Sequence, residues 1–126
     1  MLRKFAAITA LALLLPAFAA DLNGEIVTAG THAQLAAKAS DIGMVHMHLH
    51  HTLNCLVGPK GAGFDAKEMN PCANSGNGAI PDSTDAAKIA MLQDAVKTTQ
   101  AGLGSDNIAV AQEDASMVAA QLMAKK

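Results

Sequence analysis

Apolar residues recur every three or four positions along three stretches of this chain. Such spacing places their side chains on one face of an α-helix, and the long alternating or β-branched runs typical of strands are missing from the sequence. The chain is therefore predicted to be all-α. The three sets are Leu35, Ala39, Ile42, His46, Leu49, Leu53 and Leu56; Ile89, Leu92, Val96 and Leu103; and Ile108, Ala111, Ala115, Val118 and Leu122.

The first stretch is expected to be one continuous helix from residue 31 to about residue 57. Thr31 and Gln34 have the spacing of a capping box, in which each side chain satisfies a free backbone donor of the other. Gly58 and Pro59 supply the signal that ends the helix.

The second and third stretches predict a helical hairpin. Caps are expected at Asp82 or Ser83 and at Ser105 or Asp106, and Gly102-Leu103-Gly104 should end the second helix. Alanine is frequent on the apolar faces, so the helices can approach closely. The predicted fold is a small antiparallel bundle of three helices, or of four if the segment before residue 31 or a second copy contributes one.

The first residues are typical of a secretory signal peptide. Arg3 and Lys4 precede an apolar run that ends at Leu15, and Ala17 and Ala19 fit the small residues before a cleavage site. The run is too short to span a bilayer as a mature helix. We expect residues 1–19 to be removed, which leaves one periplasmic helical domain of residues 20–126 without a membrane anchor.

Cys55 and Cys72 are the only cysteines, and an even pair in an exported protein predicts a disulfide. Cys55 lies just before residues 58–82, and Cys72 lies within them. This segment is rich in Gly, Pro and Asn and is predicted to be a long loop. A loop of this length in a small domain tends to be functional or cross-linked. The alternative for the cysteines is a thiolate metal site that includes His51.

Composition argues against two classes of function. Without residues 1–19 the chain keeps seven of its nine basic residues against eleven acidic ones, and Phe64 is the only Phe, Tyr or Trp left. Such a chain offers no basic stripe for a phosphate backbone and few rings to stack on bases, so nucleic acid is not an expected partner. Because no catalytic motif is found in the sequence, we expect a binding protein rather than an enzyme.

Four of the five histidines lie within six residues. At about 100° per residue, His46 and His50 share one helix face, and His48 and His51 lie nearly opposite, on the face that carries two methionines. Imidazole suits copper, zinc and nickel, and thioether sulfur suits copper(I). The candidate ligands of a metal ion are therefore His46, His48, His50, His51, Met44 and Met47, with copper favoured and zinc or nickel as alternatives.

The fifth histidine, His32, would lie about 21 Å from His46 along one continuous helix, which is too far to bind the same ion. We therefore expect His32 to be a cap or core residue. The missing ligands should come from the later helices or from the second chain of a homodimer. The candidates on the later helices are Met91, Asp94, Glu113, Asp114 and Met117.

Two other interpretations stay open. In the first, the chain is a metal-free interaction module whose disulfide-tied loop is the recognition surface. In the second, His46 and a Met or His on a facing helix hold b-type haem for electron transfer, without the Cys-x-x-Cys-His motif of covalent attachment.

The exported, Ala-rich helices and clustered histidines resemble a bacterial family of small periplasmic metal-binding proteins. The resemblance covers residues 31–56 and 84–125, through Thr31-His32-Ala33-Gln34-Leu35-Ala36-Ala37 and later Ala-x-x-Gly spacings. It implies periplasmic binding of metal ions. Members of that family carry histidines along the whole chain, whereas none follows Asp82 here, and the segment 54–72 lies outside their pattern. These differences favour one local site over the buffering of several ions.

Overall fold

A computed structural model describes residues 19–124, and within that range the chain is all-helical, as predicted. The expected signal peptide lies outside the described residues except for Ala19, so its removal stays a prediction. The helices are α1 (Leu22–Lys38), α2 (Ile42–Val57), α3 (Ala79–Asp82), α4 (Ala86–Leu103) and α5 (Ile108–Met123).

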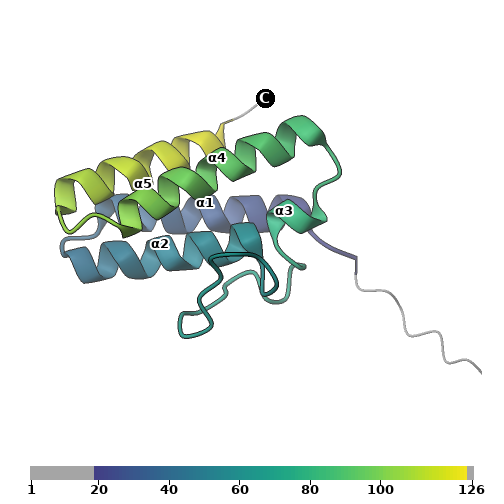
Figure 1. The fold of residues 1–126 in the computed structure, drawn as a ribbon, viewed down its shortest axis with the longest axis horizontal. Coiled ribbons are helices and arrows are strands. Elements are labelled where there is room, and N and C mark those ends of the chain that lie inside the picture. Colours follow the sequence, from purple (N-terminus) through teal and green to yellow (C-terminus); the bar gives the residue numbers. More distant parts are fainter. Residues whose placement is uncertain (1–18, 125–126) are drawn as a thin grey trace, which may run out of the picture.

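The four long helices form an up-down-up-down bundle (Figure 1). α1 packs against α2 and α5, and α4 packs against α5 and α2, so each long helix has two antiparallel neighbours. This is the four-helix form of the predicted bundle, and the segment before residue 31 supplies the additional helical turns as the first half of α1. Among the described helices, none is both long and apolar enough to cross a membrane.

The expected continuous helix over residues 31–57 is wrong. α1 ends at Lys38, Ala39 takes an extended conformation (φ −67°, ψ 142°), and the Asp41 side chain accepts a hydrogen bond from the Met44 N–H to begin α2. Thr31 is not a cap, because it lies inside α1 and its hydroxyl donates to the carbonyl of Val27. The chain therefore reverses direction at residues 39–41, and α1 and α2 are antiparallel neighbours.

All four long helices begin at a side chain that accepts hydrogen bonds from free N–H groups of the first turn. The expected caps of the last two helices are displaced by one to three residues, since Asp85 caps α4 and Asn107 caps α5. The expected ends are confirmed, with Gly58 following α2 and Gly104 following α4.

Small residues let α1 and α5 approach closely. The buried face of α1 carries Ala29, Ala33 and Ala36, and that of α5 carries Ala111 and Ala115, all fully buried. Larger side chains fill the other side of the core, where Leu49 of α2 and Leu92 of α4 are also fully buried. The bulky core residues come mainly from α2, where Val45, Leu49 and Leu56 are all fully buried.

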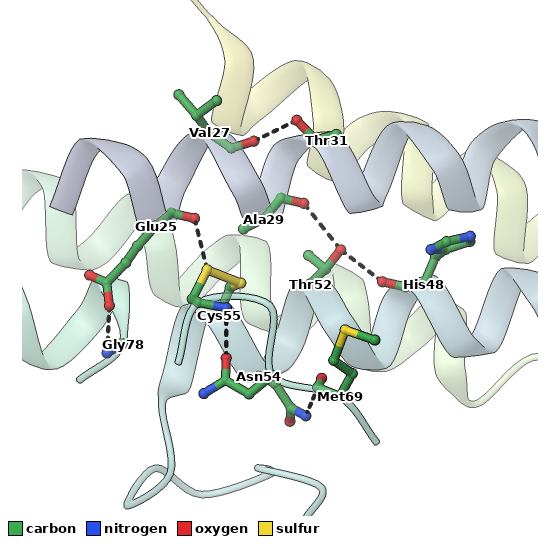
Figure 2. The surroundings of a disulfide bond; sticks show 12 residues. Glu25, Val27, Ala29, Thr31, His48, Thr52, Asn54, Cys55, Met69 and Gly78 are labelled. Carbon is green, nitrogen blue, oxygen red and sulfur yellow. Dashed lines mark hydrogen bonds between the residues drawn. A yellow bond between two sulfur atoms is a disulfide. The ribbon is translucent and has the colours of Figure 1, made fainter. Parts of the chain in front are cut away.

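The long loop is fixed to α2 by two devices. The predicted disulfide is present, with Cys55 of α2 joined to Cys72 of the loop (Figure 2). Directly before Cys55, the buried Asn54 amide donates to the carbonyls of Asp65 and Met69 at 2.9 and 3.1 Å, and its oxygen accepts from the Asp65 N–H. Residues 65–72 are consequently held against the last two turns of α2. The predicted loop 58–82 ends in the short helix α3.

Candidate metal centre

Three histidines from two helices meet at the α1–α2 interface. His32 of α1 lies opposite His48 and His51 of α2, and one ring nitrogen from each lies within 4.8 Å of the other two. The Nδ1 atoms of His32 and His48 are 3.2 Å apart, and the ring centroid of His51 lies 5.0 Å from that of His32 and 5.7 Å from that of His48. These three residues could hold a transition metal ion.

The spacing suits a single ion. Nitrogens bound at roughly 2.0–2.1 Å in tetrahedral geometry lie about 3.3 Å from each other. The pair formed by His32 and His48 already has this separation, and a ring nitrogen of His51 lies within 4.8 Å of both partners in the cluster. Three protein nitrogens leave a fourth position for water or a further ligand.

The two helices are fastened together beside the cluster. The Thr52 hydroxyl is fully buried and lies 3.2 Å from the carbonyl oxygen of Ala29 on α1 and 3.0 Å from that of His48 on α2, as Figure 2 shows. Its single proton is shared between these two acceptors. Thr52 thus fixes the register of α1 against α2 within one turn of all three histidines.

The surroundings keep the three rings neutral. Burial, followed by the neighbouring His51 and His48, lowers the pKa of His32 to about 4. Burial also lowers the pKa of His48 and of His51, and for His51 the nearby Glu68 partly opposes the effect. Because only a neutral imidazole has a free lone pair, the cluster is ready to bind an ion at neutral pH.

The structure places the other two clustered histidines elsewhere. The Nε2 of His46 lies 2.9 Å from the carbonyl oxygen of Ser105, between α4 and α5. The Nδ1 of His50 lies 3.6 Å from the carboxylate of Asp65 in the loop. The division of the four histidines between opposite helix faces is thus retained, and only His48 and His51 join the three-histidine cluster.

The two candidate methionines, Met44 and Met47, lie one helical turn before His48 and His51, on the same side of α2. Met44 is 42% exposed, so its thioether is accessible from solvent. The cysteines offer no thiolate for a metal, because both are oxidised in the disulfide.

Sequence reasoning missed His32. The predicted helix continued through residues 39–41, where the apolar spacing is uninterrupted, and so placed His32 about 21 Å from His46. The available signal was Asp41, an N-cap residue type three positions before the free N–H of Met44. A helix start at this point implies a hairpin, and a hairpin returns α2 along α1 to His32.

Comparisons with known protein families, with curated proteins and with solved structures each find no match for this chain.

Proposed function

We propose that this chain is an exported protein that binds or buffers a transition metal ion, with copper favoured, through His32, His48 and His51. The observation that carries the proposal is the convergence of three neutral imidazoles from two helices, with two Nδ1 atoms 3.2 Å apart. Three imidazoles gathered at one helix interface, one buried and two half-buried, have the capacity to bind an ion or share a proton.

Copper is favoured by two features of the ligands. Copper(II) binds nitrogen sites more tightly than zinc or nickel in the intrinsic order of affinity. Met44 and Met47 lie one turn from His48 and His51, and thioether sulfur is a ligand that copper(I) prefers over the harder divalent ions. Zinc and nickel remain the alternatives for the same three imidazoles.

The role proposed is binding rather than catalysis, in the periplasm. Support comes from the sequence, in which the basic start and apolar run are typical of an exported chain and no catalytic motif accompanies the histidines. Native mass spectrometry with elemental analysis of protein from the periplasm would identify the metal and the mature N-terminus together.

Competition titration with copper and zinc tests the ligand set. Single changes of His32, His48 or His51 to Ala should each reduce affinity by more than the roughly 10- to 100-fold typical of losing an outer-shell partner. His50→Ala is the matched control, because His50 is next to His51 in the sequence but does not belong to the cluster. The proposal fails if the wild type binds no ion, or if His50→Ala weakens binding as much as the cluster variants do.

A further inference from the structure

A carboxylate of the disulfide-tied loop lies beside one of the three histidines. The Oε2 of Glu68 is 3.6 Å from the Nε2 of His51. His51 is only 5% exposed, and its other ring nitrogen, Nδ1, is buried without a hydrogen-bond partner. The two nitrogens of this ring are therefore in different surroundings: Nε2 faces an acceptor, and Nδ1 has no hydrogen-bond partner among residues 19–124.

This difference selects one tautomer of the neutral ring. A neutral imidazole carries one proton, and the nitrogen that faces an acceptor retains it. With the proton on Nε2 toward Glu68, the lone pair of His51 is on Nδ1. At 3.6 Å the two atoms form a close polar contact slightly longer than a hydrogen bond, and the Glu68 side chain is 34% exposed.

We propose that Glu68 is a positioning residue of the metal centre: it holds the proton of His51 on Nε2 and so presents the Nδ1 lone pair to the ion. The inference rests on the proposed function. Such a centre would bind its ion through three Nδ1 atoms, since His32 and His48 already approach each other through Nδ1. Carboxylates that orient metal-binding histidines in this way are common outer-shell partners.

The loop is built to hold Glu68 in place. The Asn54 side chain donates to backbone carbonyls on both sides of Glu68, those of Asp65 and Met69. The disulfide fixes the same segment at Cys72, four residues after Glu68. Glu68 is thus tied to α2, the helix that carries His51, and its carboxylate stays within reach of the ring.

The tautomer can be read without any metal. Long-range ¹H–¹⁵N NMR spectra of the metal-free protein should show His51 protonated on Nε2. Glu68→Ala should shift the ring toward a mixture of tautomers and reduce copper affinity by roughly 10- to 100-fold. Glu68→Gln should preserve the wild-type tautomer and recover most of the affinity, because its amide oxygen still accepts a hydrogen bond.

Asp65→Asn is the matched control. It removes the loop carboxylate beside His50 but keeps the oxygen that accepts from the Lys67 N–H, so the His51 spectrum and the copper affinity should stay as in the wild type. A wild-type His51 protonated on Nδ1, or a tautomer unaffected by Glu68→Ala in a protein with a folded NMR spectrum, overturns the role of Glu68. A wild type that binds no ion overturns the proposed function instead, and the tautomer then still decides what Glu68 does.

Discussion

Replacing Glu25 with Gln should stabilise the fold at alkaline pH and leave it nearly unchanged in acid. The Glu25 side chain is fully buried, and its Oε1 accepts a hydrogen bond from the Gly78 N–H at 2.8 Å (Figure 2). Its Oε2 has no hydrogen-bond partner within the described part of the chain. Burial, reinforced by the charges of Asp82 and Asp21, raises the pKa of Glu25 from 4.5 to about 7. The folded protein therefore prefers this carboxyl protonated.

The sign and size of the effect follow from linkage. The folded state binds the Glu25 proton more tightly than the unfolded state, so stability is lost as pH rises from about 4.5 to about 7. At 1.36 kcal/mol per pKa unit, the loss reaches at most about 3 kcal/mol. The Gln side chain stays neutral at every pH and keeps an oxygen to accept from Gly78, so Glu25→Gln escapes this cost.

The histidine cluster changes the stability of the fold with pH in the opposite direction. The prediction is therefore made for the difference in stability between Glu25→Gln and the wild type. The low pKa of His32 means that stability is lost as pH falls from about 6.5 toward 4. Both proteins contain the cluster, so its contribution cancels in the difference between Glu25→Gln and wild type.

The assay is urea or thermal unfolding of both metal-free proteins from about pH 4.5 to pH 8. Between these pH values, the free energy of unfolding of Glu25→Gln should rise from near that of the wild type to about 3 kcal/mol above it. This corresponds to a difference in Tm on the order of 10 °C at the alkaline end. Glu113→Gln, the same change at an exposed position of α5, should give a flat difference. A pH-independent difference for Glu25→Gln would refute the reasoning.

Three further predictions concern the cluster and its loop. Metal binding should weaken only at a pH below the 6.5 of an ordinary imidazole, because burial lowers the pKa of His32, His48 and His51. Isothermal titration over the acid range checks this, and a loss of binding already near pH 6.5 contradicts it. Replacing both Cys55 and Cys72 with Ala should lower the free energy of unfolding by about 3 kcal/mol, because the 17-residue loop is no longer closed. The double variant should also bind copper more weakly, because the segment that holds Glu68 is released. Unfolding and copper titration of this variant measure the two effects. Asn54→Ala should lower the free energy of unfolding by about 2 kcal/mol, since it removes a buried amide that makes several hydrogen bonds to the loop backbone. Hydrogen exchange at the Asp65 N–H should rise in parallel.

Much of the bundle could be predicted from local sequence. The apolar spacing of α4 and α5 identifies their buried faces, and Gly58 and Gly104 mark helix ends because the chain stops its regular hydrogen bonding there. The disulfide followed from the presence of a single cysteine pair in a chain with the features of an exported protein. These features depend on residues close in sequence or on a count of one residue type.

The site depended on information that spacing does not carry. Ala39 fits the apolar face of a continuous helix, so periodicity alone could not reveal that the chain reverses beside it. Once α2 folds back on α1, His32 and His48 become neighbours although they are 16 residues apart. The contact between Glu68 and His51 likewise depends on how the loop returns to α2, which only the assembled fold determines.

The most direct test of the metal centre is an NMR titration of ¹⁵N-labelled protein with copper(I), which is diamagnetic, while the imidazole nitrogens are observed. At one equivalent, the ring signals of His32, His48 and His51 should move together, and those of His46 and His50 should stay in place. Movement of His46 or His50 with His32 unaffected would contradict the three-histidine centre.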